Sequence, residues 1–256
     1  TLEVVTGGTA AVNRAPQNIF IETRGGSIDW LEAGGLTTQL DDFDLSVLSL
    51  TGSAVNGQNI NDYVLQRVVL NVRNAFASIG VTVNVSTDPS AFEFQDFSTV
   101  FLTRSNDPVS QIFGRFNFFN FAGAGGIFDT INQPFGFAEH SDPLNADRND
   151  EAVVFVPALA NLGYTPSPSD VDNLVKSLTA AVGRHVGELM GLRLTADSGF
   201  GTVDLLAANS VSNLPAGNYV VPTIDRALSN NFDTAQNTDF WLGQQNSGGL
   251  LRKVLN

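Results

Sequence analysis

Two long segments with apolar side chains at helical spacing limit the folds that this chain can adopt. In residues 59–79, apolar residues recur every fourth position from Ile60 to Val72, which places them on one face of a helix. Gly80 follows at the position where glycine commonly ends a helix. Since both helical segments are interspersed with short strand-like runs, an all-helical fold is excluded.

The second helical segment spans residues 167–191 and carries the stronger start signals. Ser167 is placed to cap the helix, Pro168 suits the first helical position, and Asp170 lies near the positive end of the helix dipole. Gly191 marks its end. The segment has an apolar stripe made of Val171, Leu174, Val175, Leu178, Val182 and Leu189.

The remaining regular segments are short and predict strands. They are residues 2–6, 18–23, 43–52, 81–87, 98–105, 135–141 and 151–159. We expect a single α+β domain with a mixed, twisted sheet of about five strands and two long helices. Gly-Gly pairs interrupt residues 1–40, so this part is expected to be an extended N-terminal β segment, a candidate assembly strand. Residues 41–256 are expected to form the domain, with an irregular C-terminal region.

Charge and cysteine content exclude several function classes. The net charge is -13 with a pI of about 4.3, which repels nucleic acid and suits divalent cations. The chain has no cysteine, so disulfides, thiolate zinc sites and cysteine nucleophiles are excluded. It also lacks the G-x-S-x-G elbow of many serine hydrolases, and the glycine-rich stretch 123–126 lacks the lysine of a phosphate-binding loop.

Two features bear on location. No apolar run approaches the roughly 20 residues that a membrane-spanning helix needs, so no membrane span is expected. The sequence starts at Thr1 rather than at an initiator methionine. We therefore expect a processed protein that is secreted and is extracellular or attached to the cell surface.

The stretch AAVGRHVGELMGLRLTAD, residues 180–197, resembles the metal-binding helix of metzincin zinc proteases, especially matrixin-like secreted bacterial members. The signature of that family is H-E-x-x-H-x-x-G-x-x-H. Its first two histidines share a helix face, its glutamate is the general base, and its glycine turns the chain so that the third histidine reaches the zinc. The resemblance implies a zincin-like fold for residues 41–256.

The residues at the functional positions differ from that signature. Alignment on Gly191 places at the four positions, in order, Arg184, His185, Glu188 and Leu194. A guanidinium stays protonated and a leucine has no donor atom, so neither binds zinc. Residues 203–211 resemble the methionine turn beneath the metal, with Leu206 at the methionine position. The resemblance therefore implies a pseudoenzyme whose zinc-binding motif is lost, with no zinc expected.

The altered residues allow two interpretations. Arg184 and Glu188 are four residues apart on a helix, so they can form an ion pair in place of a metal, or only a solvated surface pair. His185 falls beside the apolar stripe, where a hydrogen-bonded, half-buried histidine is common. The alternative is an active metallopeptidase with displaced ligands, namely His140, His185 and Glu188.

An acidic stretch is a candidate calcium loop. Residues 142–151 bring together the oxygen-bearing side chains of Asp142, Asn145, Asp147, Asn149 and Asp150. Hard oxygen ligands at every second position suit Ca²⁺, although the EF-hand glycine and distal glutamate are missing. The alternative is an acidic, solvated turn between strands. Residues 41–44, DDFD, are a weaker candidate.

Two segments suggest contact between copies of the chain. Residues 112–137 hold eight phenylalanines among glycines and asparagines, either a small irregular core or a contact surface. The N-terminal residues 2–5 form a short apolar strand before a glycine hinge, which can pair with its own domain or with the sheet edge of a neighbour. The candidate interface residues are Leu2, Val4, Val5, Phe113, Phe116, Phe118, Phe119 and Phe121.

The sequence thus predicts a catalytically inactive, metzincin-like extracellular protein that self-assembles into a homo-oligomer or homopolymer, as a filament or surface layer. Besides the active peptidase, the other alternative is a pseudoenzyme module that binds a peptide or glycan in the former cleft.

Overall fold

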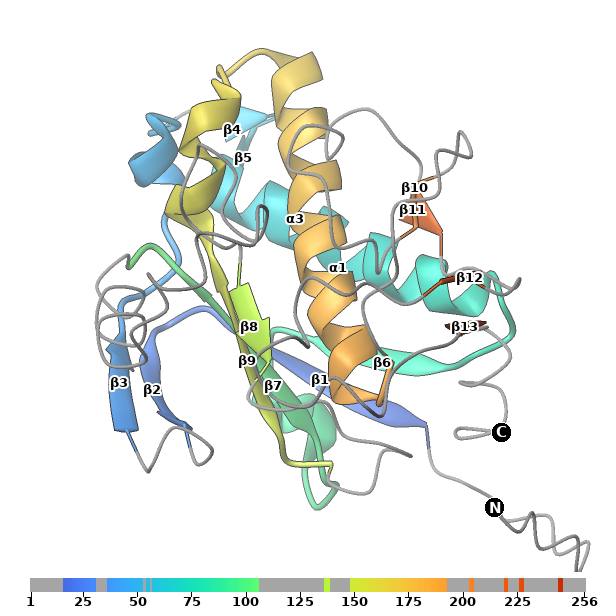
Figure 1. Cartoon of the computed structure of the whole chain (residues 1–256). Coiled ribbons are helices and arrows are strands. Elements are labelled where there is room, and N and C mark those ends of the chain that lie inside the picture. Colours follow the sequence, from blue (N-terminus) through green and yellow to red (C-terminus); the bar gives the residue numbers. More distant parts are fainter. Residues whose placement is uncertain are drawn as a thin grey trace, which may run out of the picture.

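A computed structural model provides the structure of the chain (Figure 1). It describes residues 16–30, 36–52, 54–55, 57–105, 136–138 and 148–192, and the short strands at 203–204, 219–220, 226–227 and 244–245. Among the interface residues expected above, the phenylalanines of 113–121 and the apolar residues of 2–5 lie outside these ranges.

A mixed five-stranded sheet is the framework of the molecule. Its strands are β1 (Gln17–Glu22), β6 (Val83–Ser86), β7 (Ser98–Thr103), β8 (Gly136–Ala138) and β9 (Glu151–Phe155). The order is β6-β1-β7-β9-β8, and all neighbours are parallel except β8, which runs antiparallel to β9. The predicted α+β class with a mixed sheet and two long helices is confirmed.

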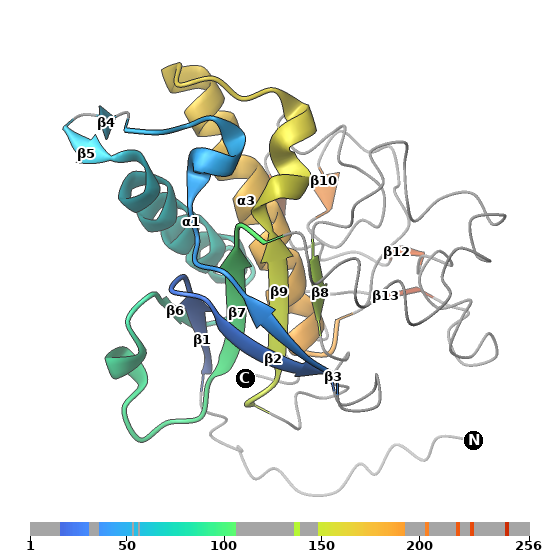
Figure 2. The ribbon, with the colours of Figure 1, turned by 90° about the vertical axis from the view of Figure 1, so that its left-hand side faces the viewer.

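Two helices cover one face of this sheet, α1 (Ile60–Ala77) and α3 (Pro168–Leu189), as Figure 2 shows. Alternate strand residues such as Ile19, Ile21 and Val154 face them and join a single buried cluster with the helix stripes. The fold is therefore a two-layer arrangement in which α3 is packed against both the sheet and α1.

The helix signals in the sequence act as expected. Asn59 caps α1, with its side-chain oxygen accepting from the backbone N–H of Asn61. Ser167 caps α3 by accepting from the N–H of Asp170, and Gly191 follows that helix with φ at 83°. The predicted boundaries of both helices are confirmed to within about two residues.

One predicted strand is wrong. Residues 43–52 contain a 3-10 helix at Leu45–Leu48 instead of a strand. The carboxylate of Asp44 accepts from both the N–H and the hydroxyl of Ser46, and this local cap favours a helical turn over an extended chain. Leu45 and Leu48 lie three residues apart and are both buried, so the short helix satisfies the apolar pattern.

The fifth strand of the sheet is instead β1, from the segment expected to be an extended N-terminal piece. All six residues of β1 are buried, because it lies between β6 and β7. The helices cover its Ile19 face, and Gln95 and Phe97 pack on its other face, against Asn18 and Phe20. Its polar residues are satisfied internally. For example, Gln17 donates to the hydroxyl of Ser98 at 2.7 Å. This part of residues 1–40 belongs to the same sheet as the rest of the fold.

Smaller elements complete the described structure. They are the pairs β2 (Gly26–Trp30) with β3 (Leu36–Leu40), β4 (Ala54–Val55) with β5 (Gln58–Asn59), β10 (Val203–Asp204) with β11 (Tyr219–Val220), β12 (Arg226–Ala227) with β13 (Gln244–Gln245), and 3-10 helices at Pro89–Phe92 and Val156–Leu162. The last of these ends the strand predicted at 151–159 early, since Pro157 cannot donate to a ladder. None of the described helices is long and apolar enough to cross a membrane.

The packing of α3 predicts a large cost for shortening one of its buried side chains. Leu178 is fully buried in the core cluster, so Leu178→Ala should lower the free energy of unfolding by about 2–5 kcal/mol. Leu70 on α1 is 48% exposed, and Leu70→Ala should change it by less than about 0.5 kcal/mol. Urea unfolding followed by circular dichroism measures both. Equal losses would contradict this helix arrangement.

Candidate functional site

The C-terminal half of α3 brings His185 and Glu188 together beside the sheet edge. The ring nitrogen Nδ1 of His185 lies 2.6 Å from Oε2 of Glu188, close enough for its N–H to donate to the carboxylate. The His185 side chain is 5% exposed and that of Glu188 is 15% exposed. His185 is therefore a buried, hydrogen-bonded histidine, as its place beside the apolar stripe indicates.

The other side of His185 faces β8. A Cβ atom built on Gly136 would lie 2.5 Å from Nε2 of His185 and would also collide with the carbonyl oxygen of Val153. Gly136 pairs with Val154 of β9, and its strand contacts α3. The edge strand thus passes the imidazole at a distance that only glycine allows.

Arg184 lies one residue before this pair and behaves differently from expectation. The predicted ion pair between Arg184 and Glu188 is not formed, because the carboxylate is bonded to Nδ1 of His185 instead. Nε of Arg184 is buried and has no hydrogen-bond partner in the part of the chain that the structure describes. The guanidinium therefore adds positive charge to the site without a direct bond to the carboxylate.

Although they form no direct bond, Arg184 and Glu188 shift each other's pKa. Burial raises the pKa of Glu188, but the charge and hydrogen bond of His185, together with the charge of Arg184, outweigh it and hold that pKa below its usual value. Burial lowers the pKa of Arg184, and Glu188 opposes this only in part. The lowered pKa keeps the Glu188 carboxylate ionised, next to the basic side chains of His185 and Arg184.

The residues proposed as metal ligands are only partly within the described structure. No three His, Cys, Asp or Glu side chains converge within the described ranges. Of the four altered positions, Leu194 lies outside those ranges, as do Leu206 and the alternative ligand His140. His185 and Glu188 are thus brought together, while the third member of the displaced-ligand set stays a prediction.

The candidate calcium loop is likewise described only at its end. Its first three oxygen donors, at 142, 145 and 147, lie outside the described ranges. Asn149 is exposed, whereas Asp150 is 1% exposed and its backbone carbonyl accepts from the N–H of Thr99. Calcium binding stays a prediction. In the weaker candidate, Asp42 and Asp44 form ion pairs with Arg104 at 2.9 and 3.7 Å.

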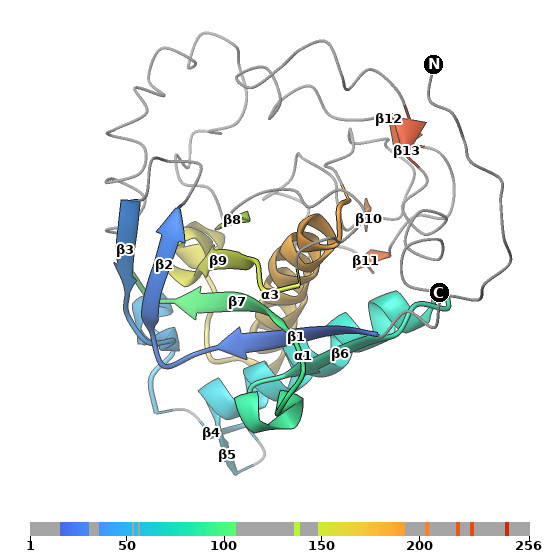
Figure 3. The ribbon, with the colours of Figure 1, turned by 90° about the horizontal axis from the view of Figure 1, so that it is seen from below.

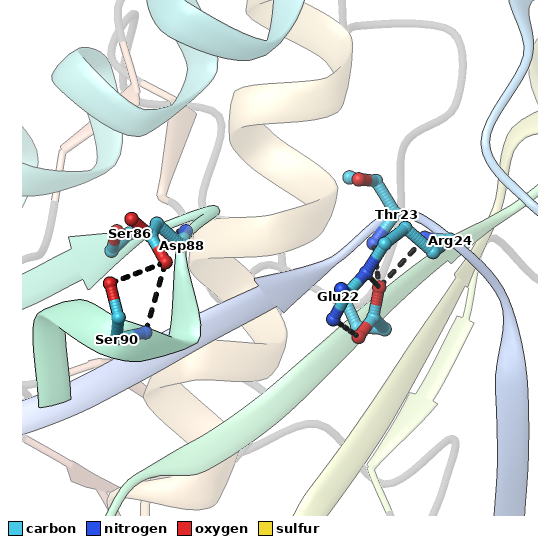
Figure 4. Close-up of polar contacts among 6 residues, drawn as sticks. All are labelled: Glu22, Thr23, Arg24, Ser86, Asp88 and Ser90. Atoms are coloured by element: carbon cyan, nitrogen blue, oxygen red, sulfur yellow. Dashed lines mark hydrogen bonds and ion pairs between the residues drawn. The ribbon is translucent and has the colours of Figure 1, made fainter. Parts of the chain in front are cut away.

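Sequence reasoning missed a polar cluster at the carboxyl ends of β1 and β6, drawn in Figure 4. Glu22 binds Arg24 through Nε and Nη2, at 3.2 and 3.0 Å, and also accepts from the backbone N–H groups of Thr23 and Arg24. Asp88 accepts from the N–H and hydroxyl of Ser90. The visible signal was an acid at or just after the end of a strand: Glu22 ends β1, in E-T-R-G-G, and Asp88 lies two residues after β6.

This end of a parallel sheet often binds ligands. Here the carboxylates bond within their own turns, Glu22 with both oxygens, so they support a structural role. Burial raises the pKa of Glu22, but the hydrogen bonds and charge of Arg24 lower it further than burial raises it.

Comparison with known proteins adds no assignment. No protein-family model matches this chain, and no curated protein matches it.

The depressed pKa of Glu22 predicts a pH-dependent contribution to stability. A carboxyl with a lowered folded pKa stabilises the fold above its ordinary pKa of 4.5, and this contribution is lost as the pH falls through the folded pKa. Glu22→Gln should therefore lower the free energy of unfolding by about 1–3 kcal/mol at pH 7 and by much less at pH 3. Urea unfolding at both pH values measures this, with exposed Glu93→Gln as the control. A pH-independent loss would contradict it.

The contact between β8 and His185 predicts that Gly136 cannot be enlarged. Gly136→Ala should lower the free energy of unfolding by about 1–3 kcal/mol, because backbone must move to accept the methyl group. In the control Gly26→Ala, the new methyl would meet only the Phe101 side chain, at 3.1 Å, which can shift. Thermal unfolding compares the two. A loss no larger than that of the control would place β8 further from α3.

Proposed function

We propose that this chain is a catalytically inactive, metzincin-like domain of an exported, extracellular protein with a structural, self-assembling role. The observation that carries the loss of catalysis is the Arg184 guanidinium beside the His185–Glu188 pair. These are the positions where the resemblance implies two zinc ligands and the general base.

The chemistry of these residues does not fit a zinc ion of that kind. Arg184 is positively charged and has no lone pair to donate, so it repels a cation where a ligand would be required. The carboxylate of Glu188 already accepts from His185 at 2.6 Å, and it would have to exchange that bond for a metal. We therefore derive no metal-dependent step at this site.

The architecture supports the zincin-like part of the proposal at the level of fold class. The helix that carries the altered motif packs against β8, the antiparallel edge strand of the mixed sheet. The resemblance places the strand that borders the substrate cleft in the segment that leads into β8. The helix and the edge strand are thus neighbours, in direct contact.

The self-assembling role is supported by the sequence segments that can contact another copy. These are the Phe-rich stretch 112–137 and the apolar residues 2–5 before Gly7 and Gly8. Calcium bound at 142–151 would stiffen the connection that leads into β9. No other partner is proposed, and the acidic charge disfavours nucleic acid.

Metal analysis tests the inactive site. Protein purified without chelator should contain far less than one zinc per chain by elemental analysis, and it should not cleave a casein substrate with or without added zinc. About one zinc per chain, lost together with peptidase activity in Glu188→Gln, would instead identify an active metallopeptidase with displaced ligands. Added calcium raising the melting temperature would support the 142–151 site.

Mass measurement tests the assembly role. Sedimentation velocity over a concentration series should show species larger than the 27.3 kDa monomer, with their share rising with concentration. A monomer at every concentration, with and without calcium, would contradict self-assembly. If such a monomer bound peptides or glycans, the binding-module alternative would replace it.

A further inference from the structure

The strand β6 forms one border of the sheet, and this border is open within the described part of the chain. In the order β6-β1-β7-β9-β8, β6 pairs with β1 alone, and Figure 3 shows it beyond β1 and away from β9. An edge strand presents N–H and C=O groups that can bond to an added strand. Within the described ranges, the Arg73 side chain of α1 donates to the backbone carbonyl of Val85 in β6.

The connection that leaves β6 displays an unusual residue, Phe94. Its side chain is 98% exposed, although phenylalanine is among the residues most often buried. Its backbone φ is 63°, in the left-handed region that bulky L-residues rarely adopt. The exposed ring and its unfavourable backbone conformation make Phe94 a candidate contact residue.

The residues around Phe94 hold this conformation in place. The rings of Phe92 and Phe97 lie 5.9 Å apart, and Phe97 packs edge-on against Phe20 of β1 at 5.7 Å. On the other side, the Asn18 amide donates to the side chain of Gln95 at 3.1 Å and to the carbonyl of Asp96 at 3.0 Å. Phe94 is therefore presented outward by a turn that Gln95, Asp96 and Phe97 anchor to β1, as pre-organised binding residues are.

The chain also holds a segment that suits such an edge. Fifteen residues precede Pro16, the first described residue, which leads directly into β1 beside β6. Within them, Leu2, Val4 and Val5 are apolar, and valine is enriched in strands. Gly7 and Gly8 follow, and glycine allows many backbone directions after such a strand. The stretch from Leu2 to Pro16 can extend about 45 Å, which is enough to reach a neighbouring molecule.

We propose that the open edge of β6 accepts residues 2–5 of a second copy of this chain as an added strand, with Phe94 in the connection that follows β6 as a second contact. Backbone hydrogen bonds would supply the pairing, and Phe94 would cover the apolar side chains of the incoming strand. Donor and acceptor are different surfaces of one chain, so the contact is head-to-tail and can propagate. This inference rests on the proposed self-assembly and names the surfaces that carry it.

Cysteine cross-linking tests the pairing, because the chain has no cysteine of its own. Val4→Cys in one copy is mixed with Thr82→Cys or Thr87→Cys in a copy enlarged by a tag. Thr82 and Thr87 are exposed and flank β6, so one of them should lie near residue 4 in either strand direction. On oxidation we expect the mixed dimer in at least several-fold excess over that formed with Leu70→Cys, an exposed control position on α1.

Removal of the aromatic ring provides the second measurement. Phe94→Ser should weaken association at least tenfold by sedimentation while leaving the circular dichroism spectrum unchanged, and Leu70→Ser should leave association unaltered. Retained association in Phe94→Ser, or cross-links only within one chain in the doubly substituted Val4→Cys/Thr82→Cys protein, would overturn the inference. Oligomers that form without the mixed cross-link would overturn it but leave self-assembly standing. A monomer at all concentrations would overturn both.

Discussion

The packing of α3 against both α1 and the sheet is the constraint on which the rest of the structure depends. The helix is buried around most of its circumference from Ser177 to Met190, so its rotation and its register against the sheet are fixed. That register decides which of its residues meet β8. His185 reaches the edge strand and Glu188 lies three residues on, because helix geometry places them on one face.

Polar side chains on a buried helix such as α3 destabilise the fold unless they find hydrogen-bond or charge partners. Removing a zinc ion from a zincin-like site would leave buried donors without a partner, at a cost of several kcal/mol. In this chain Glu188 is compensated by His185 and by the nearby charge of Arg184. The Glu188 carboxylate is thus neutralised by its neighbours, which allows α3 to keep this charge within its packing.

The fold was predictable where local signals agreed with burial. Ser167, Pro168 and Gly191 define α3, and the every-fourth-residue pattern defines α1. Prediction failed at residues 43–52, where the Asp44 cap outweighed an alternating pattern. The strand predicted at 18–23 is confirmed as β1, but its place inside the main sheet was missed, because its partners lie more than sixty residues away. A hydrogen-bonded His185 was expected, but its bond to Glu188 was not, because Arg184 is also a helix neighbour of Glu188 and was taken as its partner.

The two borders of the sheet now differ in a way that bears on function. At one border, β8 is antiparallel and lies so close to His185 that Gly136 has no room for a side chain. This edge is therefore packed against α3. At the other border, β6 is parallel to β1, and the connection that follows it exposes the Phe94 ring to solvent. Strand pairing needs only the backbone, so the β6 edge can form contacts between molecules whatever the chemistry at the β8 edge.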